Sequence, residues 1–180
     1  MSKSINLQDI KNGFPGLDPV SANYCYVACM VCLHRNNHSD GVLLDLKGDT
    51  VATIILQWED CFNDQIDRTW KDQEYTTEHA AICISAMLVK ECTDYTIIER
   101  SRKHTGFDYW LGKENDIPFL KSARLEISGI FQETEQNNVE KRFQIKKKQT
   151  EQSDKLQLPA YISIIEFSQP RAFFAKKIVL

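Results

Sequence analysis

The segment TTEHAAICISAMLVKEC, residues 76–92, decides the fold class because it is the clearest helix signal in the chain. Thr76 or Thr77 stands near the expected cap and Glu78 falls in the first turn, where a carboxylate complements the helix dipole. The pattern predicts a helix over about 76–91 that is apolar nearly all round. Such a helix has no side that can face water without exposing apolar surface. It is therefore expected to be buried against a sheet.

Strand patterns dominate the sequence after this helix. Periodicity and β-branched residues predict strands at 95–101 (YTIIERS), 107–112 (FDYWLG), 123–131 (ARLEISGIF) and 159–168 (PAYISIIEFS), with a helix at about 138–150 before the last of them. The order from residue 76 is thus α-β-β-β-α-β. The tail AFFAKKIVL, residues 172–180, predicts a final edge strand.

The first part of the chain predicts an αββ extension. A helix is expected at about 20–35, and GVLLDLKGDTVATIILQW (41–58) predicts two strands around a Lys-Gly-Asp turn. Residues 59–75 are polar and predict a loop with a helical turn at most. A length of 180 residues suits one α+β domain, in which an extension of residues 1–75 packs on a core of residues 76–180.

Composition is that of an ordinary globular protein, with 42% apolar and 26% charged residues. No apolar run resembles a secretory signal or approaches the roughly 20 residues of a membrane span, so a cytoplasmic protein with no membrane partner is expected. The net charge of −3 is uneven: residues 1–120 hold 11 Lys and Arg against 18 Asp and Glu, and residues 121–180 hold 11 against 7. The basic part could meet phosphates, but a solvated helix face is the simpler interpretation.

Three cysteines in the first predicted helix raise the question of a zinc site. Cys25, Cys29 and Cys32 share one helical face, and His34 and His38 follow them. Zinc binds such thiolate and imidazole groups. The surrounding helix is apolar, however, and cysteine is a favoured small core residue. A core helix is therefore the preferred interpretation.

Acidic residues in the predicted strands suggest a different site. Alternation puts Glu126 on the face of its strand opposite to Leu125 and Ile127, which are expected to pack on the core. If strands 107–112 and 123–131 pair, Asp108 lies beside Glu126. Adjacent carboxylates repel, and they are tolerated mainly where a cation binds between them. The Arg124, Glu126 and Ser128 face is therefore expected at an edge or in a cleft.

The helix at about 138–150 carries an inward stripe of Val139, Arg142, Phe143, Lys146 and Gln149. Val139 and Phe143 anchor this stripe, so Lys146 and Gln149 are drawn toward the sheet. A lysine brought inward needs a carboxylate partner, which the acidic pair could supply. The plainer alternative is that Lys146 and Gln149 extend to solvent.

This arrangement resembles the core of the PD-(D/E)xK, or restriction-endonuclease-like, nuclease superfamily over about residues 76–168. That superfamily has an acid on its first core helix, an aspartate on its second strand, a Glu-x-Lys on its third and often a glutamine on the next helix. The matching positions are Glu78, Asp108, Glu126 and Gln149. The pattern departs at Ser128, where lysine is usual. Some members carry the lysine on the following helix, which indicates Lys146.

The strings GFDYWLG and ARLEISGI are also similar to an uncharacterised bacterial family of this kind. The resemblance implies a metal-dependent endonuclease acting on nucleic acid, with Asp108, Glu126 and the carbonyl of Ile127 binding Mg²⁺ or Mn²⁺. Lys146 would orient a water molecule or stabilise developing charge. Glu78 and Gln149 would support these groups. A homodimer or a protein partner is a further expectation from the resemblance.

Two alternatives remain. The serine at position 128 and the acidic net charge also suit a nuclease-like fold that no longer cuts and serves as a binding or assembly module. The second alternative is a plain α+β interaction domain that uses exposed Trp58, Trp70 or Trp110.

Overall fold

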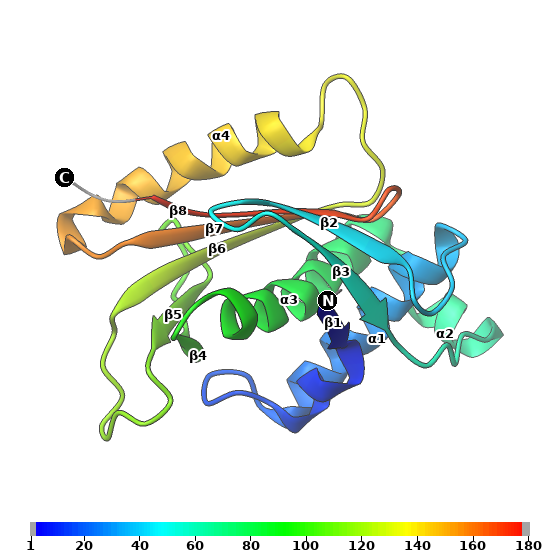
Figure 1. The fold of residues 1–180 in the computed structure, drawn as a ribbon, viewed down its shortest axis with the longest axis horizontal. Helices are drawn as coiled ribbons and strands as arrows, with labels where there is room; N and C mark the ends of the chain where they lie inside the picture. The colour runs from blue at the N-terminus through cyan, green and yellow to red at the C-terminus, as the bar shows by residue number, and fades with distance from the viewer. Residues whose placement is uncertain (1–2, 178–180) are drawn as a thin grey trace.

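One eight-stranded mixed sheet runs through the protein, with helices on both of its faces (Figure 1). The structure is a computed structural model that describes residues 3–177. The elements are β1 (Lys3–Asn6), the 3-10 helix η1 (Leu7–Asn12), α1 (Pro19–Arg35), β2 (Leu43–Gly48), β3 (Ala52–Gln57), α2 (Asp64–Thr69), α3 (Gln73–Cys92), β4 (Thr96–Arg100), β5 (Tyr109–Gly112), β6 (Ala123–Ile130), α4 (Val139–Gln149), the 3-10 helix η2 (Thr150–Leu156), β7 (Ala160–Glu166) and β8 (Arg171–Lys177). The expected α+β class and the α-β-β-β-α-β order from α3 to β7 are observed.

The sheet has the strand order β1-β3-β2-β8-β7-β6-β5-β4. Strands β4, β5 and β6 pair antiparallel, and α4 then crosses over so that β7 lies parallel to β6. Strand β8 pairs antiparallel with β7 and parallel with β2. This last pairing joins the strands of the N-terminal region to the rest of the sheet.

The prediction of a final edge strand at residues 172–180 is wrong for the part that the structure describes. Residues 172–177 belong to β8, which lies inside the sheet, while residues 178–180 fall outside the described range. Both edges of β8 are paired, and Ala172 and Phe174 on one of its faces pack into the main core. Strand β2 is more than 120 residues away in sequence, as the Asp45–Arg171 register pair shows, so the local pattern of β8 could not reveal it.

Helix α3 begins three residues earlier than predicted because Asp72 is its cap. The Asp72 carboxylate accepts a hydrogen bond from the backbone N–H of Tyr75 at 3.0 Å. Thr76 and Thr77 lie inside the helix, and their hydroxyls donate to the carbonyls of Asp72 and Gln73. The helix packs against β6 and β7 on one side and against α1 on the other, which explains its lack of a polar face.

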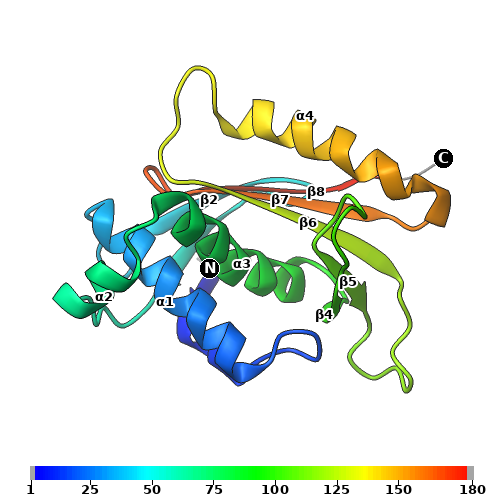
Figure 2. The ribbon, with the colours of Figure 1, turned by 180° about the vertical axis from the view of Figure 1, so that it is seen from behind.

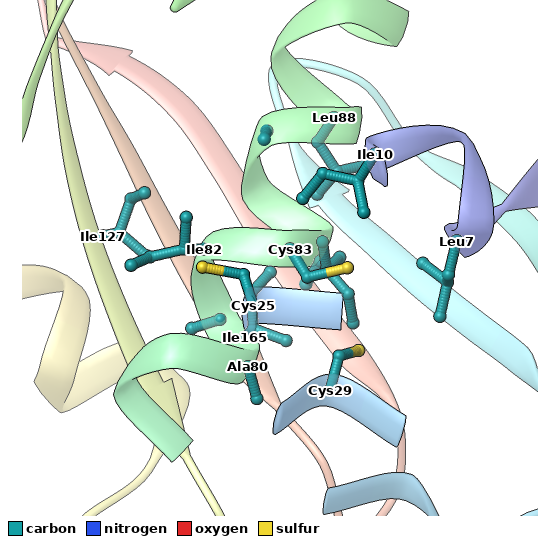
Figure 3. Packing of buried hydrophobic residues seen from close by; sticks show 14 of the residues in the cluster. Leu7, Ile10, Cys25, Cys29, Ala80, Ile82, Cys83, Leu88, Ile127 and Ile165 are labelled. Carbon is teal, nitrogen blue, oxygen red and sulfur yellow. The ribbon is translucent and has the colours of Figure 1, made fainter. Parts of the chain in front are cut away.

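The three cysteines of α1 lie in the core, as preferred from the sequence. Figure 3 shows Cys25 and Cys29 beside Cys83 of α3. Among residues 3–177 there is no group of three or more His, Cys, Asp or Glu side chains that could hold a metal ion. The zinc interpretation is therefore not supported for the described residues.

Helix α4, with η2 after it, lies on the other face of the sheet, opposite α1 and α3 (Figures 1 and 2). Val139 is buried against Ile130, Ile162 and Ile164, and Phe143 packs beside them. Burial of one such valine stabilises the fold by about 2 kcal/mol. This anchor fixes which side of α4 faces the sheet, and with it the direction of the polar residues on the same stripe.

Two of the tryptophans expected on the surface are buried. Trp58 is 5% exposed and Trp70 is 3% exposed, and both belong to the main core. Trp110 is half-buried, so it is not freely exposed either. No helix within the described range has the length and apolar character needed to cross a membrane.

Candidate functional site

A cleft of about 580 Å³ opens between the first turns of α3, the ends of β5 and β6, and α4. Asp108 and Ile127 line it from the sheet, Glu78 from α3, and Arg142 and Lys146 from α4. The cleft therefore collects side chains from three elements that are far apart in the sequence.

Asp108 lies one residue before β5, where the pairing with β6 ends. Its backbone N–H donates to the carbonyl of Leu125 at 2.8 Å, and its Oδ2 accepts the N–H of Ile127 at 2.8 Å. The Asp108 carboxylate thus accepts the hydrogen bond of the Ile127 N–H, which would otherwise go to a backbone carbonyl of the neighbouring strand. Burial raises the pKa of Asp108, while the Ile127 N–H and the charge of Lys146 act in the opposite direction.

Glu126 projects from β6 toward α4, because Leu125 and Ile127 occupy the opposite face of the strand. Its Oε1 accepts hydrogen bonds from Lys146 Nζ at 2.6 Å and from Gln149 Nε2 at 2.9 Å. Lys146 Nζ also donates to Gln149 Oε1 at 3.1 Å. The i, i+3 spacing of Lys146 and Gln149 places both on one face of α4. These two residues thus turn toward the acidic pair, as the stripe predicted.

The second carboxylate oxygen of Glu126, Oε2, is buried and accepts no hydrogen bond from another described residue, and a proton on this carboxyl can be shared with the Asp108 carboxylate. Burial raises the pKa of Glu126 to about 8, and repulsion from Asp108 adds to this effect. The ion pair with Lys146 lowers the pKa but does not cancel the rise. The site therefore has an excess of buried acidic groups that a further positive charge would stabilise.

The oxygen atoms of this site suit a hard divalent cation. Mg²⁺ and Mn²⁺ prefer carboxylate and carbonyl oxygens. Glu126 offers its unpartnered Oε2, and Asp108 lies beside it. In a strand the N–H and C=O of one residue point to the same side, so the carbonyl of Ile127 lies on the side of Asp108, where its N–H is bonded. Two carboxylates and one carbonyl are the ligand types that such an ion prefers; Asp108 and Ile127 line the cleft, whereas Glu126 is buried and does not line it.

Glu78 and Ser128 take a smaller part in this arrangement. Glu78 lines the cleft from α3, but its side chain is exposed and makes no hydrogen bond to another described residue. Ser128 Oγ lies 3.4 Å from Arg142 Nη1. Arg142 is oriented mainly by Asn137, whose Oδ1 accepts two of its N–H groups at 2.6 and 3.1 Å.

The expectation that the Arg124, Glu126 and Ser128 face lies at an edge or in a cleft is wrong at Arg124. This face is covered by α4 and η2, and Arg124 is fully buried. Its guanidinium donates to Ser153 Oγ at 2.6 Å and to the Leu158 carbonyl at 2.6 Å, and it pairs with Asp154 at 3.1 Å. Arg124 therefore holds η2, and with it the end of α4, against the sheet.

Arg100 is a cleft residue that the sequence did not single out. It ends β4, and its Nη1 donates to the hydroxyl of Tyr109 at 3.0 Å. Its side chain thereby faces the cleft rather than the open end of the strand. An arginine in an ERSRK run carries no local signal that separates it from its solvated neighbours.

Comparisons of the chain with protein-family models, with curated proteins and with solved structures found no match. The function of the cleft is therefore argued from its own geometry and chemistry.

Proposed function

We propose that the protein is a metal-dependent phosphodiester hydrolase of the PD-(D/E)xK type that acts as an endonuclease on nucleic acid. The observation that carries this proposal is the arrangement around Glu126. Lys146 and Gln149 both bond its Oε1, while the buried Oε2 beside Asp108 accepts no hydrogen bond from any other residue between 3 and 177. An acidic pair with an attached lysine and one free buried oxygen suits cation binding beside a hydrolytic centre.

The order of the elements supports the proposal. The four matching residues lie on or beside the elements that the resemblance requires: Glu78 on α3, Asp108 just before the second core strand, Glu126 on the third and Gln149 on the next helix. Lys146 reaches Glu126 from α4, so a lysine is present at the acidic pair although Ser128 occupies the usual position. This contact supports the assignment of the catalytic lysine to Lys146.

Asp108, Glu126 and the carbonyl of Ile127 would hold Mg²⁺ or Mn²⁺. The ion, when bound, would polarise a phosphodiester and lower the pKa of a water molecule. Lys146 would stabilise negative charge that develops on the phosphate, because its ammonium group is held at the site before the reaction. Gln149 would hold the side chains of Lys146 and Glu126 in position through its hydrogen bond to each of them.

Cleavage of labelled DNA and RNA in the presence of Mn²⁺ tests this proposal. Asp108→Asn is expected to reduce cleavage by at least about 100-fold, because it removes a charged ligand while keeping a side chain that accepts the Ile127 N–H. Asp94→Asn is the matched control, since Asp94 is exposed and does not line the cleft. Wild-type protein that cuts no nucleic acid with Mn²⁺ or Mg²⁺ would contradict the proposal.

One observation favours a second candidate, a nuclease-like fold that serves as a binding or assembly module without catalysis. The ion pair between Lys146 and Glu126 at 2.6 Å already neutralises part of the buried charge, as a purely structural pair would. Such a module keeps the fold and the ion pair but does not bind Mn²⁺ through Asp108 and Glu126. Metal binding therefore discriminates between the two candidates.

A further inference from the structure

A second hollow adjoins the cleft on the side of α1. It is a recess of about 250 Å³ lined by Val20 and Tyr24 of α1, His79 of α3, Arg100 of β4 and Tyr109 of β5. His79, Arg100 and Tyr109 line the main cleft as well, so the two hollows share a wall. The N-terminal region thus contributes one side of a recess that shares lining residues with the proposed active site.

The rings at this recess form a rigid cluster with an accessible surface. Tyr24 packs on the buried Trp70 at 4.4 Å between ring centroids and edge-on against His79 at 5.4 Å. Its hydroxyl lies 3.2 Å from that of Tyr75. Tyr24 nevertheless remains 40% exposed and Tyr75 remains 45% exposed. Partly exposed aromatic rings that are held in place are the kind of surface on which nucleobases stack.

Basic side chains gather in a third hollow, beside Asp108. Arg102, Lys103 and His104, in the turn between β4 and β5, line a hollow of about 380 Å³ together with Arg100 and Asp108. This hollow shares Arg100 and Asp108 with the main cleft. Three permanently charged basic side chains face one carboxylate there, which favours a phosphate backbone.

We propose that the recess holds one unpaired nucleobase of a single-stranded nucleic acid, with Tyr24 and His79 as its aromatic walls. The following phosphates pass Arg100, reach Asp108, and continue along Arg102 and Lys103. A base within a duplex is stacked on both faces and cannot enter such a recess, so the site selects single strands. The acidic excess of residues 1–120 also disfavours a long duplex outside this narrow basic path.

This inference rests on the proposed function for its cleavage step, but its binding step does not need a metal ion. It assigns a role to α1, which lies outside the nuclease-like core. Helix α1 supplies Val20 and Tyr24, and thereby one wall of the base site. The N-terminal region would thus select the strandedness of the substrate.

Fluorescence anisotropy with labelled 12-nucleotide DNA and RNA, each as a single strand and as a duplex, tests the inference in the presence of EDTA. The wild type is expected to bind single strands more tightly than duplexes. Tyr24→Ala is expected to weaken single-strand binding about tenfold, the typical effect of losing one stacking ring. Phe119→Ala is the matched control, because Phe119 is 45% exposed, close to the 40% of Tyr24, and lines neither the cleft nor the recess.

A second variant guards against unfolding of Tyr24→Ala. Val20 is 80% exposed, so Val20→Glu leaves the core intact and puts a negative charge at the mouth of the recess. It is expected to weaken single-strand binding, and the effect should shrink at high salt. Equal affinity for duplexes, no single-strand binding, or no effect of Val20→Glu would overturn the inference.

Asp108→Asn separates this inference from the proposed function. It should reduce cleavage by at least about 100-fold and keep single-strand binding. Single-strand binding without any cleavage by the wild type would contradict the proposed function and leave the base site supported. Cleavage that is indifferent to Tyr24→Ala and Val20→Glu would contradict the base site and leave the hydrolase supported.

Discussion

Replacing Glu126 with glutamine should change how the stability of the protein depends on pH. Glutamine keeps the shape of the side chain but cannot ionise, so it imitates the protonated glutamate. The pKa of Glu126 rises from 4.5 to about 8 on folding, chiefly through burial and then through repulsion by Asp108. The folded state therefore binds the Glu126 proton more tightly than the unfolded state does.

The sign of the effect follows from this difference. Stability from the protonated Glu126 is fully present below pH 4.5 and is lost as pH rises through 8. At about 1.36 kcal/mol per pKa unit, the wild type should lose up to about 4 kcal/mol of unfolding free energy between pH 5 and pH 8 through this group. Glu126→Gln should not show this loss, so the variant gains relative to the wild type as pH rises.

Urea unfolding at several pH values from 5 to 9, in EDTA, measures this difference. Glu114→Gln is the matched control, because Glu114 is exposed in the loop between β5 and β6. Its difference from the wild type should change much less with pH. A Glu126→Gln difference that stays constant across this range, or that shrinks as pH rises, would refute the account of Glu126 as a buried acid without a full set of partners.

Two further predictions concern Lys146 and the contacts by which Arg124 holds η2 against the sheet. Lys146→Met should abolish Mn²⁺-dependent cleavage. Adding Ser128→Lys to this variant should restore part of the activity, because residue 128 points to the same face of β6 as Glu126. A cleavage assay that finds Lys146→Met fully active would rule out a catalytic role for Lys146. Arg124→Met should lower the unfolding free energy by about 1–3 kcal/mol, because it leaves the buried acceptors at Ser153 and Leu158 without their donor, while Asp154 keeps its ion pair with Lys177. A loss well below about 1 kcal/mol in urea unfolding would mean that η2 is held by other contacts.

The elements near the site could be predicted because their signals are local. The apolar character of α3 and the β-branched runs of β4, β6 and β7 depend on residues within each segment. The inward orientation predicted for one stripe of α4 is also confirmed, because Val139 and Phe143 pack on the sheet and thereby turn Lys146 toward it. The alternation of side chains along β6 then correctly predicted that Glu126 lies on the face opposite to Leu125 and Ile127.

The features that escaped prediction depend on contacts between distant segments. Strand β8 is internal only because β2, from the other end of the chain, pairs with it. Arg124 is buried because η2 folds over it. The segment ARLEISG contains no signal for its hydrogen-bond partners, which lie about 30 residues later in the sequence. The recess at Tyr24 needs α1 beside β4, a neighbourhood set by the packing of α1 on α3. Local patterns carry no information of this kind.

Mn²⁺ binding measured by calorimetry tests the central claim most directly. The proteins compared are the wild type and the Asp108→Ala, Glu126→Ala double variant, with circular dichroism to check that both are folded. The account predicts that the wild type binds Mn²⁺ and that the double variant does not, because the ion needs both carboxylates. No binding by the wild type, or equal binding by the folded double variant, would contradict the claim that these strand carboxylates form a metal site.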